Sequence, residues 1–65
     1  MDFILVNEVV WRSSGEKVLK PLIVNTRYIR KIVPRLSTTC YLYIAGEQWI
    51  EIDGTVTENW QGIES

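Results

Sequence analysis

Cys40 is the obvious candidate nucleophile by residue type, and it is the single cysteine in a sequence of 65 residues that has no histidine. Without histidine, the usual catalytic triads and acid–base pairs are unavailable. Alternation along a strand places Cys40 on the same face as Leu42 and Ile44, which indicates a buried, unreactive thiol. A lone thiol among carboxylates also lacks the ligand spacing of a zinc site.

Glu51 and Asp53 are the second candidate for chemistry, because they lie two positions apart on one face of a predicted strand. Carboxylates about 7 Å apart can work as an acid–base pair. Carboxylates that alternate along a solvated strand are nevertheless common, and the glycines of the chain form no phosphate-binding loop. We therefore expect no enzyme, no cofactor and no metal site.

A basic segment is the first candidate binding surface, and it consists of Arg27, Tyr28, Arg30, Lys31 and Arg35. Cations interleaved with an aromatic ring can bind phosphate and stack a base, which predicts an anion or nucleic-acid contact. The other interpretation is a solvated face whose charges keep a strand edge from aggregating. The acidic isoelectric point of about 5.2 favours this second interpretation.

An aromatic face is the second candidate, and it carries Tyr41, Tyr43 and Trp49. Outward aromatic side chains are covered by another part of the chain, buried between subunits, or used to stack single-stranded nucleic acid. A short terminal helix can cover only one face of a sheet, so burial between subunits is the leading interpretation. The acidic residues nearby would repel phosphate, which counts against nucleic acid here.

A first hairpin is predicted from residues 3–12 and 17–24, which are rich in β-branched and aromatic residues and flank a turn at 13–16. Pro21 donates no ladder hydrogen bond, so the second strand is either an edge strand or is bulged there. A second hairpin is predicted over residues 39–53, with a three-residue loop near Gly46.

Pairing of Ile44 with Ile50 would keep the apolar residues of this second hairpin on one face. Between the hairpins, the apolar spacing suits one turn of helix that runs into a third strand, and it leaves open whether residues 26–33 are helix or strand. Pro34 is expected to end this segment, and a loop is expected over 35–38. Thr55 and Glu58 match a capping box that begins a short helix, in which Trp60 packs on the sheet.

Self-association is expected because a chain of this size has a thin core and a single cysteine excludes an internal disulfide. A compact monomer is the alternative. All seven basic residues lie in 1–35, whereas five of the eight acidic residues lie in 36–65. This separation could steer head-to-tail association or a charged ligand, unless folding interleaves the two halves.

A cytoplasmic location is expected from three features of the sequence. No apolar run approaches the roughly 20 residues that span a bilayer. The start of the sequence carries an acid in place of the basic region of a signal peptide. The single free cysteine fits a reducing compartment.

Three features occur together along most of residues 3–63: a V-N-x-x-x-I-x-x-I segment at 24–32, alternating aliphatic residues in the second hairpin, and the helix start at 55–58. In this order of elements the chain resembles the small flagellar and swarming-motility accessory proteins of the FlbD/SwrD type. The resemblance implies a similar fold and, by analogy, an accessory role in motility. It departs from the family at Ala45 and Gly46, where Asp-Gly or Asn-Gly is usual.

We therefore predict a single domain over residues 1–65 of mainly β (α+β) class, with a small antiparallel sheet of four to five strands and a short C-terminal helix. The expected function is that of a non-catalytic accessory or regulatory protein that acts through homo-oligomerisation and contacts with other proteins. The alternative is a nucleic-acid-binding module that uses the basic segment and aromatic stacking.

Overall fold

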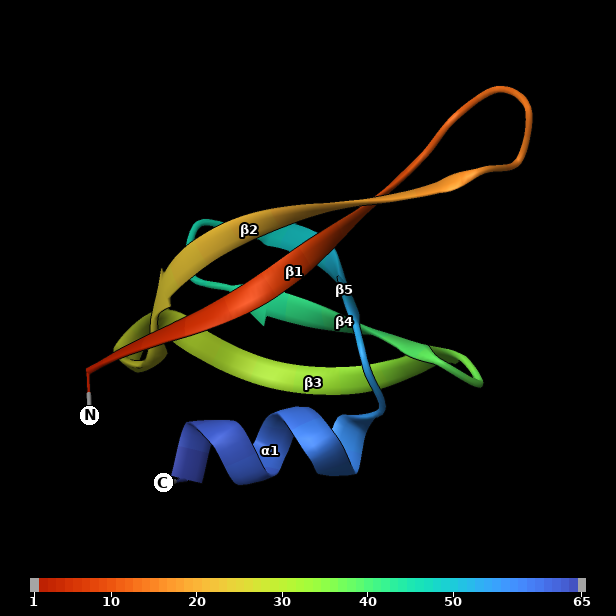
Figure 1. The fold of residues 1–65 in the computed structure, drawn as a ribbon. Helices are drawn as coiled ribbons and strands as arrows, with labels where there is room; N and C mark the ends of the chain where they lie inside the picture. The colour runs from red at the N-terminus through yellow and green to blue at the C-terminus, as the bar shows by residue number, and fades with distance from the viewer. Residues whose placement is uncertain (1, 65) are drawn as a thin grey trace.

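The structure, a computed structural model, describes residues 2–64. It contains a five-stranded antiparallel sheet followed by one α-helix, which confirms the predicted fold class (Figure 1). The elements in chain order are β1 (Phe3–Trp11), β2 (Lys17–Asn25), the 3-10 helix η1 (Thr26–Tyr28), β3 (Ile29–Leu36), β4 (Thr39–Ile44), β5 (Gln48–Asp53) and α1 (Val56–Glu64). No helix in the described part of the chain is long and apolar enough to cross a membrane.

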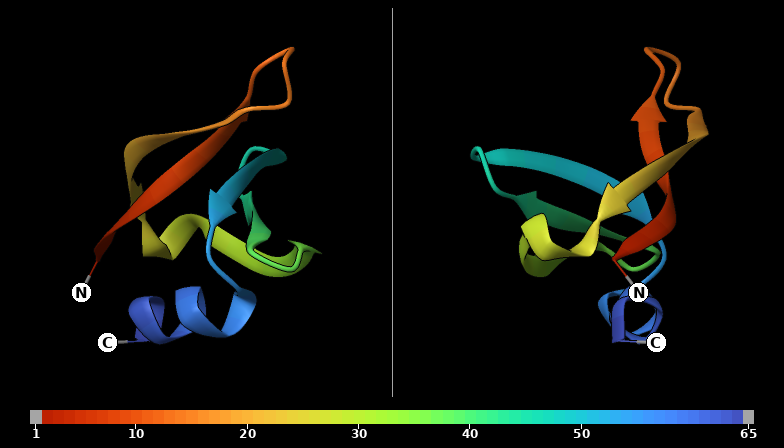
Figure 2. Two further views of the ribbon diagram at one scale, coloured as in Figure 1. Left: turned by 45° about the vertical axis from the view of Figure 1, so that its right-hand side comes forward. Right: turned by 90° about the vertical axis from the view of Figure 1, so that its left-hand side faces the viewer.

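The sheet has the strand order β2-β1-β5-β4-β3, so β2 and β3 are its two edges. It is strongly curved, and η1 links the two edge strands (Figure 2). Each edge strand contains a proline, Pro21 in β2 and Pro34 in β3. The β1–β2 register runs without a shift through Pro21, so the edge interpretation is confirmed and the bulge is not.

Each of the two hairpins has a three-residue loop. In the first, the Gly15 N–H donates to the Arg12 carbonyl and the Arg12 N–H donates to the Glu16 carbonyl, both at 2.9 Å. Gly15 has a φ of +89°, as a three-residue loop with a glycine bulge requires. The second hairpin also has a three-residue loop, at residues 45–47, as predicted.

The predicted pairing of Ile44 with Ile50 is wrong by two residues. Ile44 pairs with Gln48, and Ile50 pairs with Leu42. Because side chains alternate with a period of two, this shift leaves every residue on its predicted face. The core therefore forms as expected, on the inner face of the curved sheet.

The core cluster lies inside this curve. Its buried members are Val6, Val24, Cys40, Leu42, Ile50 and Ile52. The helix α1 lies below β3 in Figure 1 and adds Val56 to the cluster. Both hairpins and the helix thus contribute to one apolar interior.

The segment between the hairpins corrects two predictions. It forms the short helix η1 and then enters β3, which confirms the turn of helix that runs into a third strand. Pro34 does not end the strand, and the loop expected over 35–38 is a turn at Ser37 and Thr38. A proline is tolerated because β3 is an edge strand, whose outward backbone groups need no partner in the sheet.

The capping box of α1 is confirmed. The Glu58 N–H donates to the Thr55 hydroxyl at 3.2 Å, and the Thr55 N–H donates to the Glu58 carboxylate at 2.9 Å. In the next residue, the Asn59 amide donates to the carbonyls of Asp53 and Thr55 and to the Cys40 sulfur. Asn59 thereby fixes the start of α1 to the sheet.

Candidate binding surfaces

The predicted aromatic cluster forms on the outer face of the β4–β5 hairpin. The ring of Trp49 lies 4.6 Å from that of Tyr43 and 5.8 Å from that of Tyr41, in the second case edge to face. These are separations at which aromatic rings attract one another. Trp49 is 47% exposed and the two tyrosines are half-buried, so the cluster is accessible from solvent.

Three cations of β3, Lys31, Arg35 and Arg30, border this cluster. The Lys31 ammonium lies 5.5 Å from the ring centres of both Tyr43 and Trp49, and the Arg35 guanidinium lies 5.6 Å from the ring centre of Tyr41. The β3–β4 register shifts between Ile29 and Lys31, so that Arg30 has no partner of its own there.

Arg30 lines a surface hollow together with Tyr43, at the end of the cluster nearest the β4–β5 loop. The term aromatic–cation face is used below for Arg30, Lys31, Arg35, Tyr41, Tyr43 and Trp49. Part of the basic segment and the whole aromatic face, which look separate in the sequence, therefore form one surface in the structure.

The other two members of the basic segment lie elsewhere. Arg27 belongs to η1 and pairs with Asp2, at 3.6 Å between the guanidinium Nε and the carboxylate. Tyr28, also in η1, is exposed and lines a groove beside β2. The structure thus divides the predicted anion site, with three residues at the aromatic cluster and two outside it.

The carboxylates of Glu51 and Asp53 have structural partners. Glu51 accepts hydrogen bonds at 2.9 Å from both the Trp11 indole and the Thr39 hydroxyl, and its side chain is only 9% exposed. Arg35 approaches the same carboxylate at 3.6 Å, and Lys17 contacts Asp53 at 3.1 Å. These pairs join the basic part of the sequence to the acidic part, so folding does interleave the two halves.

Cys40 is fully buried, as its strand parity predicts. Burial raises the pKa of its thiol, and the hydrogen bond from the Asn59 amide opposes that rise. A thiol that is both inaccessible and protonated is a poor nucleophile. Within residues 2–64, no group of three or more His, Cys, Asp or Glu side chains is placed to hold a metal ion.

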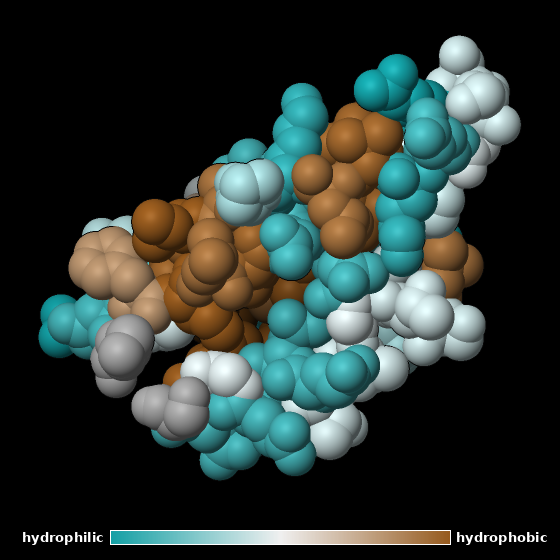
Figure 3. Space-filling model, viewed as in Figure 1, coloured by the Kyte–Doolittle hydropathy of each residue, from teal (hydrophilic) through white to brown (hydrophobic). Residues whose placement is uncertain are grey.

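The β1–β2 hairpin carries an exposed apolar patch that was not predicted from the sequence. Leu5 and Ile23 pair directly across the two strands and are 67% and 68% exposed, with Phe3 exposed two positions earlier on the same face of β1. Phe3, Leu5 and Ile23 are called the outer patch below. In the space-filling view, hydrophobic residues gather over this hairpin (Figure 3).

The signal for the outer patch was present in the sequence. Residues 3–6 and 22–24 are continuous apolar runs instead of alternating ones, a pattern typical of strands that are buried on both faces. In the described structure only the inner residues of these runs, such as Val6 and Val24, are buried.

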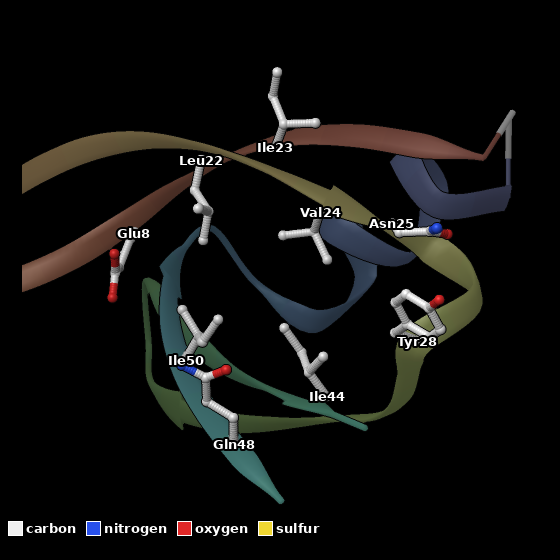
Figure 4. Close-up of a pocket in the computed structure, with 9 residues that line it drawn as sticks. All are labelled: Glu8, Leu22, Ile23, Val24, Asn25, Tyr28, Ile44, Gln48 and Ile50. Carbon is white, nitrogen blue, oxygen red and sulfur yellow. The ribbon is translucent and has the colours of Figure 1, made fainter. Parts of the chain in front are cut away.

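A groove lies between β2 and the β4–β5 hairpin, on the inner side of the sheet (Figure 4). Leu22, Val24, Ile44 and Ile50 form its apolar floor. Glu8 lies at one end, and Tyr28 lies at the other. Its volume is about 310 Å³. Sequence reasoning did not predict it, because it depends on how the two hairpins face each other.

Comparison of the chain with protein-family models, with curated proteins and with solved structures finds no match.

Proposed function

We propose that this protein is a non-catalytic accessory or regulatory protein that acts through contacts with proteins, the first of them a second copy of itself. The observation that carries the proposal is the exposed cross-strand pair of Leu5 and Ile23. Full burial of such a side chain contributes about 1.5–3 kcal/mol. In a two-fold symmetric dimer each copy contributes both residues, so four side chains are buried at the interface. Their burial could stabilise the dimer by several kcal/mol.

The size and charge of the chain are consistent with self-association. A 65-residue domain buries a small fraction of its surface, and oligomerisation is one common way to add core. The net charge of −1 produces little repulsion between copies. The aromatic cluster predicted as an interface could extend the contact through Trp49, which is the most exposed of its three rings.

The molar mass in solution, measured by light scattering on a sizing column at low and high salt, tests this proposal. We expect a fixed multiple of 7.6 kDa at both salt concentrations, because the contact is apolar. The Ile23→Thr substitution keeps a β-branched residue on the strand and should reduce the mass toward that of a monomer. Leu36→Thr is the matched control, because Leu36 is exposed on the opposite edge strand.

The outcome of these measurements shows which surface forms the contact between copies. If Trp49→Ala breaks the assembly and Ile23→Thr does not, the aromatic cluster is the interface and the outer patch is not. If the assembly dissociates with salt, charge pairing between copies holds it together. A monomer for the unsubstituted protein at micromolar concentration would contradict self-association.

A nucleic-acid-binding module is the second candidate, and the convergence of Arg30, Lys31 and Arg35 on the aromatic cluster supports it. Aromatic rings that stack bases beside cations that contact phosphates are typical of single-strand binders. The acidic residues that argue against this function are partly neutralised, since Glu51 and Asp53 both pair with cations.

Fluorescence anisotropy with a labelled oligothymidylate of about 15 nucleotides tests this second candidate. We expect weak binding that falls steeply as salt rises. Lys31→Glu should weaken binding, whereas Arg27→Glu should not, because Arg27 lies outside the aromatic–cation face. Equal effects of the two substitutions, or binding that ignores salt, would contradict this function.

A further inference from the structure

Glu8 occupies a position where the sheet otherwise carries core residues. It has the same strand parity as Ile4 and Val6, both of which pack in the core. Its side chain is half-buried, and among residues 2–64 it forms no ion pair, although Lys20 lies directly across from it on β2. A half-buried carboxylate without an ion-pair partner favours a cation supplied from outside.

The rest of the groove determines the size of what can enter. The apolar floor of Leu22, Val24, Ile44 and Ile50 lies between Glu8 and Tyr28 (Figure 4). Small-molecule sites have volumes of roughly 300–1,000 Å³, and this groove of about 310 Å³ is at the lower limit. It can therefore accept one or two side chains, which favours a peptide segment over a large ligand.

The free edge of β2 provides the main-chain contacts that such a segment needs. In the β1–β2 pair, hydrogen-bonded and non-hydrogen-bonded residue pairs alternate. Arg12 and Glu16 are a hydrogen-bonded pair, so every second pair along the register from there is hydrogen-bonded. The pair of Leu5 and Ile23 falls between such pairs, and the N–H and C=O of Ile23 therefore point away from β1. The Ile23 side chain points away from the groove in Figure 4, so its main chain borders the groove.

We propose that this groove binds an extended, basic segment of a partner protein, in which an arginine or lysine lies two positions from an aliphatic residue. The main chain of the segment pairs with Ile23 at the edge of β2. The aliphatic side chain enters between Leu22 and Ile50. The basic side chain reaches Glu8. Glu8 pairs with Lys20, and Lys20 is two positions from Leu22 on β2, so a residue two positions from the aliphatic one lies level with Glu8.

The spacing in this segment follows from strand geometry. Residues two apart on a strand share a face and lie about 7 Å apart. The groove lies on the inner side of the sheet, whereas the outer patch and the aromatic–cation face lie on its outer side. Ile23 belongs to both the groove and the outer patch, since its side chain lies in the outer patch and its main chain borders the groove, so the effects of Glu8 substitutions, and not of Ile23 substitutions, distinguish peptide binding from self-association.

Amide chemical shifts of the isotope-labelled protein, recorded during titration with a synthetic peptide, test this proposal. The probe is the capped heptapeptide Thr-Arg-Thr-Val-Thr-Arg-Thr, in which an arginine lies two positions from valine in either strand direction. We expect shift changes at Glu8, Ile23 and Ile50, with little change at Tyr41 and Trp49. The matched peptide carries glutamate in place of both arginines and should bind much more weakly.

Substitutions of Glu8 and of Lys20, its neighbour on β2, should have opposite effects on the affinity for the peptide. Glu8→Gln removes the charge with little change in shape and should weaken binding about fivefold, the equivalent of a partly solvated ion pair. Lys20→Gln removes the neighbouring cation and should strengthen binding. Glu16→Gln at the exposed hairpin tip is the charge-matched control and should change nothing.

The proposal is overturned by any of four results. The first is equal binding of the arginine and glutamate peptides. The second is unchanged affinity in Glu8→Gln when its spectrum shows a folded protein. The third is binding of the small cation arginine amide as tightly as the peptide, which would indicate a site for a free cation. Absence of shift changes at millimolar peptide would likewise overturn it.

Discussion

The indole N–H of Trp11 donates a hydrogen bond of 2.9 Å to the carboxylate of Glu51, a residue 40 positions away in the sequence. Thr39 donates a second hydrogen bond to the same carboxylate, and Arg35 pairs with it. The four residues come from four of the five strands, β1, β3, β4 and β5. Glu51 therefore holds together the outer face of the sheet.

Trp11→Phe should lower the free energy of unfolding by about 1 kcal/mol, because it leaves a nearly buried carboxylate with one hydrogen bond fewer. Chemical denaturation followed by circular dichroism measures the change. Trp60→Phe is the control, because Trp60 is exposed on α1 and is not among the hydrogen-bond or ion-pair partners of this carboxylate. Equal losses in the two variants would show that the Trp11–Glu51 hydrogen bond contributes nothing specific.

Asn59→Ala should cost about 1–2 kcal/mol of stability, because the Asn59 amide bonds the carbonyls of Asp53 and Thr55 and the sulfur of Cys40. The loss should appear first as fraying of α1, which hydrogen exchange of the helix amides detects. Gln61→Ala, at an exposed position of the same helix, is the matched control. A stability unchanged from the parent would show that α1 docks without Asn59.

The capping box predicts a pH dependence. The main-chain N–H of Thr55 and then its hydroxyl hold the pKa of Glu58 below its usual range. A carboxyl group with a lowered folded-state pKa stabilises the fold above its ordinary pKa, and the contribution is lost as pH falls through the folded-state value.

Melting temperatures of the parent and of Glu58→Gln should therefore differ at about pH 7 and converge as the pH falls below the ordinary glutamate pKa of about 4.3 and through the lower folded-state value. Glu16→Gln at the hairpin tip is the control for loss of a surface charge. A difference between the parent and Glu58→Gln that persists unchanged in acid would contradict the capping assignment.

Cys40 should resist a thiol reagent such as Ellman's reagent in the native protein. Burial keeps the reagent out and raises the thiol pKa, so labelling requires local or global opening. At about pH 8 we expect a rate at least about a hundredfold below that of the protein in denaturant. Ser13→Cys in a Cys40→Ala background provides an exposed reference, and equal rates for the two thiols would contradict burial.

Local sequence determined the features that depend on a few adjacent residues. The faces of the β4–β5 hairpin follow from period-two alternation of Cys40, Leu42 and Ile44, and the start of α1 follows from the spacing of Thr55 and Glu58. The aromatic cluster was predictable for the same reason, because Tyr41 and Tyr43 have the opposite parity. These rules involve only backbone geometry and nearest neighbours.

The tertiary structure decided which of these segments meet. The pairing of β3 with β4, with its register shift at Arg30, brings three cations of the basic segment to the aromatic cluster and leaves the other two residues of that segment elsewhere. The strand order brings Trp11 to Glu51. The groove beside Glu8 exists because the two hairpins face each other across the curve of the sheet. Such contacts depend on strand order and curvature, which the whole chain sets and no single segment encodes.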